Sequence, residues 1–163
     1  MNSPPRFKDA LEVFARHDVE LIVVGGVAAV IGGVPLATFD LDVVHARDAA
    51  NLDRLQRALE DLDARYRDPG GRTLRPDVSS LAGAGHHLLM TRCGPVDVLG
   101  SIGRGRNYEV LLPHALAVQL GGLTIRVLGL EVLIQTKEEA GRDKDRAALE
   151  LLRRALRNSK EPQ

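Results

Sequence analysis

The chain has 163 residues, 44% hydrophobic and 27% charged, which is the balance of an ordinary globular protein with a sizeable core. Its 22 basic and 22 acidic side chains give a formal net charge of zero, so a globally basic nucleic-acid binder is not indicated, although a local basic face remains compatible. Aromatic residues make up only 3% of the chain, which argues against binding of single strands by base stacking.

Two further features bear on where the protein resides. Cys93 is the only cysteine, so no disulfide forms within the chain, as expected in a reducing compartment. Residues 21–39 carry no charge and are long enough to raise the question of a membrane helix, but four glycines and a proline interrupt the run. We therefore expect a cytoplasmic protein that does not associate with a membrane.

The first half of the chain alternates apolar strands with amphipathic helices. Helical spacing of apolar side chains predicts a helix over residues 7–17, and the continuous apolar run at 19–24 is typical of a buried strand. A glycine turn, a short helix and a second strand follow within residues 25–44. A leucine stripe then predicts a helix over 51–62, for which Asp48 is the candidate N-cap.

Residues 63–85 are interpreted as a solvated loop. The alternative is that the arginines of this loop form a positive rim near a substrate entrance. Beyond it, a hairpin, two strands joined by paired glycines and two helices are predicted. These elements cover residues 87–92, 96–99, 115–120, 124–128, 130–140 and 144–157. The alternation of strands and helices indicates an α/β (α+β) protein, expected as a single domain with a core over 6–128 and C-terminal helices over 129–158.

The clearest chemical signal lies at residues 23–44, where an apolar run ends in two glycines and a second β-branched run carries two acids. Side chains two apart on a strand share a face, so Asp40 and Asp42 are predicted side by side while their neighbours face the core. Paired carboxylates are tolerated when a cation lies between them, and oxygen ligands suit Mg²⁺ or Mn²⁺. The Gly25–Gly26 turn lets backbone amides approach a phosphate closely.

These residues and their spacing resemble the signature of the DNA polymerase beta-type nucleotidyltransferase superfamily. Gly25 and Gly26 are followed after thirteen residues by Asp40-x-Asp42, preceded by Thr38. Within the superfamily the chain is similar to small bacterial minimal nucleotidyltransferases and to AbiEii-type toxins. The resemblance implies a nucleotidyltransferase fold, with a central mixed sheet flanked by helices. It also implies a Mg²⁺ or Mn²⁺ cofactor and a nucleoside triphosphate substrate such as ATP.

Asp97 is the candidate third acid, because it is isolated in an apolar strand where a charge is costly unless it is paired or binds a metal. By the resemblance, Asp97 completes the metal site of Asp40 and Asp42 and accepts the proton of the attacking hydroxyl. The alternative is an acid at a strand edge, paired with an arginine.

The resemblance also assigns residues to the nucleotide. Gly25, Gly26 and Thr38 are expected to contact the β- and γ-phosphates. On the C-terminal helices, Lys137 is expected to contact phosphate, Arg142 and Lys144 to add positive charge, and Asp145 to orient Lys137 or the nucleotide. The alternative is a solvated helical surface on which these charges pair with one another.

Two departures from many relatives are Gly32-Gly33 in place of His-Gly and Leu36 in place of an arginine that contacts phosphate. The leading hypothesis is a nucleotidyltransferase that moves a nucleoside monophosphate to a hydroxyl acceptor. The resemblance implies that the acceptor is a tRNA 3′ end, a partner protein or a small molecule. It also implies that the protein belongs to a toxin–antitoxin system. The second hypothesis, motivated by Leu36, is a catalytically silent nucleotide-binding or antitoxin-like interaction module.

Overall fold

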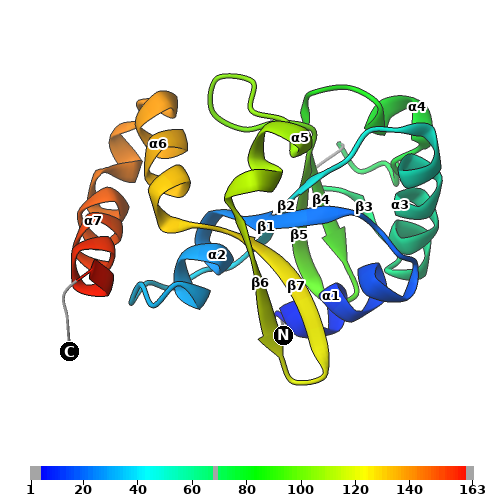
Figure 1. Cartoon of the computed structure of the whole chain (residues 1–163). Coiled ribbons are helices and arrows are strands. Elements are labelled where there is room, and N and C mark those ends of the chain that lie inside the picture. Colours follow the sequence, from blue (N-terminus) through cyan, green and yellow to red (C-terminus); the bar gives the residue numbers. More distant parts are fainter. Residues whose placement is uncertain (1–4, 68–69, 161–163) are drawn as a thin grey trace.

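The computed structural model describes residues 5–67 and 70–160, which form a seven-stranded mixed sheet covered by helices (Figure 1). The strand order is β3-β4-β5-β2-β1-β7-β6. The central pairs β2–β5 and β1–β7 are parallel, and the other neighbours are antiparallel. The strands are β1 (Leu21–Val24), β2 (Leu41–His45), β3 (Arg65–Tyr66), β4 (His86–Thr91), β5 (Gly94–Leu99), β6 (Ala115–Leu120) and β7 (Leu123–Leu128). The expected fold class, a mixed sheet flanked by helices, is confirmed.

The helices fall into two groups along the sheet (Figure 1). Helices α1, α3 and α4 pack together near β3 and β4, whereas α6 and α7 pack together at the other end, with α2 between them and the sheet. The elements are α1 (Phe7–Arg16), α2 (Gly25–Ile31), α3 (Ala49–Asp61), α4 (Val78–Leu81), α5 (Tyr108–Leu111), η1 (Leu112–His114), α6 (Leu130–Ala140), η2 (Asp143–Asp145) and α7 (Arg146–Lys160). Among the described residues, no helix combines the length and the apolar character that crossing a bilayer requires.

Local sequence explains where several helices begin and end. The Asp48 side chain accepts a hydrogen bond from the Asn51 amide at 3.1 Å, so Asp48 caps α3 as predicted. Helix α6 ends at Gly141, whose left-handed backbone (φ 62°) is readily adopted by glycine. The chain then turns through η2 into α7, so the predicted helix over 144–157 begins two residues later and continues to Lys160.

The core lies on both faces of the central strands. All four residues of β1 are buried, and Leu41 and Val43 of β2 point into the same core with no exposed surface. A second buried cluster of Ala29, Val34, Ile134 and Leu152 joins α2 to α6 and α7. This second cluster holds the C-terminal helices beside the end of β2 that carries the acids.

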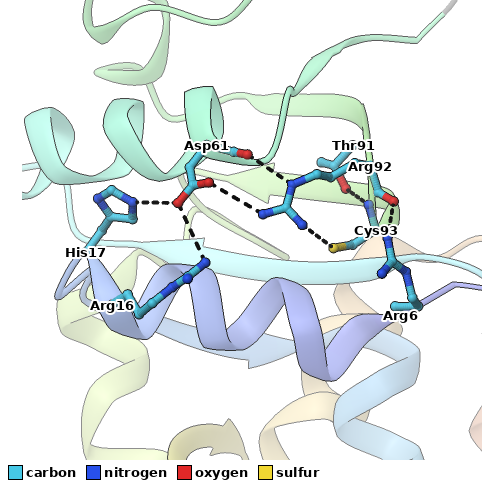
Figure 2. Close-up of polar contacts among 7 residues, drawn as sticks. All are labelled: Arg6, Arg16, His17, Asp61, Thr91, Arg92 and Cys93. Atoms are coloured by element: carbon cyan, nitrogen blue, oxygen red, sulfur yellow. Dashed lines mark hydrogen bonds and ion pairs between the residues drawn. The ribbon is translucent and has the colours of Figure 1, made fainter.

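Away from that end, a polar cluster joins three elements (Figure 2). The Asp61 carboxylate at the end of α3 lies 3.1 Å from His17 Nε2 and 3.7 Å from Arg16 Nη2. Arg92, in the turn between β4 and β5, donates to the Asp61 carbonyl at 3.1 Å. The His17 contact is the main cause that lowers the pKa of Asp61, with the two arginines adding to it. These contacts fix α1 and α3 against the β4–β5 turn.

Several predicted boundaries are wrong. In the predicted hairpin of strands 87–92 and 96–99, the second strand begins earlier than expected: β5 starts at Gly94, and the turn is at residues 92–93. The predicted loop over 63–85 contains β3 and α4, and α5 follows the loop after β5. Residues 68–69 of the predicted loop lie outside the described residues. Strand β2 begins at Leu41, so Asp40 lies immediately before the strand and not within it.

Candidate active site

Three carboxylates meet where β2 and β5 run side by side. These strands are parallel neighbours, and their register places Asp42 directly opposite Asp97. Asp40 precedes β2 by one residue. One carboxylate oxygen from each acid lies within 4.8 Å of the others. The structure therefore brings together the three acids that the sequence singles out, although Asp97 lies more than fifty residues after Asp40 and Asp42 in the chain.

The electrostatics of this cluster favour a bound cation. Burial, followed by repulsion from Asp40 and Asp97, raises the pKa of Asp42 to about 8. Burial likewise raises the pKa of Asp97, although the positive charge of Arg67 opposes the increase. Among the described residues, the buried Oδ1 of Asp42 receives no hydrogen bond. Three hard oxygen donors with an unsatisfied buried atom fit a divalent ion such as Mg²⁺ or Mn²⁺.

The glycine pair is needed because the chain passes close to this cluster. Val24, the last residue of β1, is in register with Asp42, so the next residue turns past the Asp42 carboxylate. A Cβ at Gly25 would collide with that carboxylate, and its φ of +63° also favours glycine. A Cβ at Gly26 would lie 2.6 Å from the Thr38 hydroxyl oxygen.

Of the three residues predicted to contact phosphate near this turn, Gly25 lines the cavity described below, and Gly26 and Thr38 face each other. The Thr38 hydroxyl donates to the Asp40 carbonyl at 3.1 Å, so it braces the segment that delivers the first acid. The phosphate contacts of all three residues stay predictions.

The acids open into a cavity of about 660 Å³ between the sheet and the C-terminal helices. One wall is cationic, because Lys137, Arg142 and Lys144 all line it. Asp145 is buried there and accepts from Arg142 Nε at 2.9 Å, with Lys137 Nζ at 3.6 Å. The structure thus places all four C-terminal residues that the resemblance assigns to the nucleotide at one cavity, with Asp145 positioned to orient Lys137.

The opposite wall is formed by β4 and the residue after β3. Leu88 is 46% exposed, although it is a large apolar residue, and His86 lies on the same side of β4 two residues earlier. Arg67 also lines the cavity, and its Nη2 lies 2.8 Å from Asp97 Oδ1. The arginine-rich stretch was the only sequence signal for this wall, and the pairing of β3 with β4 brings Arg67 into it.

No protein-family model matches the chain, and no curated protein matches its sequence. A solved structure from Thermotoga maritima, described as a "putative nucleotidyltransferase", superimposes with a TM-score of 0.58. The match covers 93% of this chain and 91% of that protein, at 18% sequence identity. At this identity the similarity establishes a shared fold, and the narrower resemblance to AbiEii-type toxins stays a prediction.

Proposed function

We propose that this protein is a metal-dependent nucleotidyltransferase that moves a nucleoside monophosphate from a nucleoside triphosphate to a hydroxyl acceptor. The observation that carries the proposal is the meeting of Asp40, Asp42 and Asp97 where the start of β2 lies beside β5. Burial and then repulsion from Asp40 and Asp97 raise the pKa of Asp42, which supports the proposal because a cation would relieve that repulsion. The shared fold with the Thermotoga maritima protein adds support.

The three acids would hold Mg²⁺ or Mn²⁺. Bound there, a divalent ion neutralises phosphate charge and makes an acceptor hydroxyl more acidic. Lys137, Arg142 and Lys144 face the same cavity and hold the anionic triphosphate by charge and hydrogen bonds. Asp145 keeps Lys137 in place through their ion pair.

The reaction itself follows from this arrangement. The acceptor oxygen forms a bond to the α-phosphorus while the bond to pyrophosphate breaks. Asp97 accepts the hydroxyl proton, because it lies on the strand beside β2 and directly opposite Asp42. The cationic wall holds the departing pyrophosphate.

We propose three acceptor classes from the resemblance: a tRNA 3′ end, a partner protein and a small hydroxylated compound. A role as a toxin–antitoxin component in the cytoplasm belongs to the same proposal. On the β4 wall of the cavity, Leu88 and His86 are accessible to an acceptor.

A silent nucleotide-binding or antitoxin-like module is the second candidate, and Leu36 favours it. Leu36 packs against the apolar cluster of α2, α6 and α7, so it replaces a phosphate contact with a packing contact. Such a module would still hold a triphosphate against Lys137 and Arg142 without transferring it.

The test incubates the protein with Mg²⁺ or Mn²⁺, each labelled triphosphate in turn, and total tRNA or cell extract. We expect one acceptor to gain the mass of a nucleoside monophosphate and Asp42→Asn to abolish that gain. The matched control is Asp53→Asn, which alters an exposed ion pair with Arg57 and should transfer normally. Nucleotide binding without transfer to any acceptor would support the silent module instead.

A further inference from the structure

Arg67 is fixed on the edge of the cavity by contacts with β4. Its backbone amide donates to the Leu88 carbonyl at 3.0 Å, and its Nη1 donates to the Leu89 carbonyl at 3.1 Å. Its Nη2 then lies 2.8 Å from Asp97 Oδ1. The side chains of Arg67 and Asp97 are 27% and 12% exposed, so solvent screens this ion pair only in part.

The other cation close to the acids has a different partner. Lys137 lowers the pKa of Asp42 through its charge, but its Nζ pairs with Asp145 at 3.6 Å. Among the described residues, Arg67 is therefore the cation that forms a salt bridge with one of the three acids. It neutralises one of three carboxylates that otherwise repel each other.

We propose that Arg67 supplies the countercharge at Asp97 in the metal-free protein, and that a divalent ion that binds Asp97 Oδ1 requires Arg67 to release that oxygen. This inference rests on the proposed function, because it assumes that Asp97 is a metal ligand. Mg²⁺ lies about 2.0–2.1 Å from a carboxylate oxygen that binds it. The guanidinium at 2.8 Å from Asp97 Oδ1 would then face a double positive charge at close range, so both cations cannot hold that oxygen.

The position of Arg67 in the fold suits such a release. It follows β3, which has two residues and forms one edge of the sheet. Its guanidinium keeps the Leu89 carbonyl as a partner after Asp97 is lost, so the freed charge is not left without a hydrogen bond. Arg67 is accordingly a positioning residue that sets how readily the third carboxylate becomes available.

The test measures Mn²⁺ affinity without nucleotide, by calorimetry and by the electron paramagnetic resonance signal of free Mn²⁺. We expect Arg67→Gln to bind Mn²⁺ about tenfold more tightly than the wild type, because no guanidinium competes for Asp97. Arg67→Lys keeps the charge and should stay within about threefold of the wild type. Lys137→Gln removes an equal charge from the opposite wall and should tighten binding less than Arg67→Gln.

A second readout uses thermal unfolding. In EDTA, Arg67→Gln leaves the acids without their direct countercharge, so its melting temperature should fall below that of the wild type. Added Mn²⁺ should then raise the melting temperature of Arg67→Gln by more than that of the wild type.

The outcomes separate the two proposals. If the wild type binds Mn²⁺ and Arg67→Gln binds it equally or more weakly, the role of Arg67 is overturned. The proposed function then still stands. An equal gain in Lys137→Gln would also overturn it, because the effect would then come from the general field of the cavity. Absence of Mn²⁺ binding in both wild type and Arg67→Gln would overturn both proposals.

Discussion

Asp42→Asn should stabilise the metal-free protein, although the same change should abolish catalysis. The pKa of Asp42 is raised from 3.8 to about 8, mainly by burial and then by Asp40 and Asp97. Between these two pH values the folded state holds a proton that the unfolded chain has released. The free energy of unfolding therefore falls by about 1.4 kcal/mol for each pH unit from about 4 to about 8.

The full span of about four pH units corresponds to an upper limit of about 5–6 kcal/mol. The three neighbouring acids share protons, which relieves part of this cost. We therefore expect the free energy of unfolding of Asp42→Asn to be about 2–4 kcal/mol higher than that of the wild type in EDTA at pH 8. For a chain of this size, that corresponds to a melting temperature higher by roughly 5–15 °C. The advantage should shrink as the pH falls toward 4 and vanish below the unfolded pKa of 3.8, where Asp42 is protonated in both the folded and the unfolded chain.

Urea unfolding followed by circular dichroism between pH 4 and pH 9, with EDTA throughout, measures the difference between the two proteins. Saturating Mg²⁺ should reverse it, because the wild type gains more from the ion than Asp42→Asn does. A difference that stays flat across this pH range, or a less stable variant at pH 8, would refute the reasoning.

Three further tests address other parts of the structure, two of them with a matched control variant. Gly25→Ala should lower the free energy of unfolding by about 2–4 kcal/mol and weaken Mn²⁺ binding, because its Cβ meets the acid cluster. The control is Gly33→Ala, at a glycine with φ +94° and open space around it, which should lower the free energy of unfolding by only about 1 kcal/mol. Leu152→Ala removes a fully buried side chain and should cost about 2–5 kcal/mol, against less than about 0.5 kcal/mol for Leu116→Ala, which is 62% exposed. Lys137→Gln should raise the KM for nucleoside triphosphate about tenfold in steady-state assays; an unchanged KM would remove Lys137 from the site.

Much of the fold and of the acid cluster was predictable because its signals are local. The alternation around Asp40 and Asp42 places both carboxylates on one side, and the isolation of Asp97 in an apolar strand marks it as unusual. The helix cap at Asp48 and the glycine-joined pair β6–β7 likewise depend on neighbouring residues. Such features need only the periodicity of a strand or helix and the chemistry of a turn.

The missed features depend on contacts between distant parts of the chain. Strand β3 has two residues, and it exists because it pairs with β4, more than twenty residues further on. Arg67 reaches Asp97 only through that pairing, so its sequence neighbourhood resembles any arginine-rich loop. Helices α4 and α5 have four residues each, too few for helical periodicity to be recognised.

The turn between β4 and β5 gives the chain a natural reporter of local opening. The N-terminal segment lies over this turn, with the Arg6 amide donating to the Cys93 carbonyl at 2.9 Å and the Arg6 guanidinium donating to the Arg92 carbonyl (Figure 2). Cys93 is buried, with only 2% of the residue exposed. Since Cys93 is the one thiol in the chain, the rate at which an alkylating reagent modifies the native protein reads out how often this segment lifts away, without any engineered label.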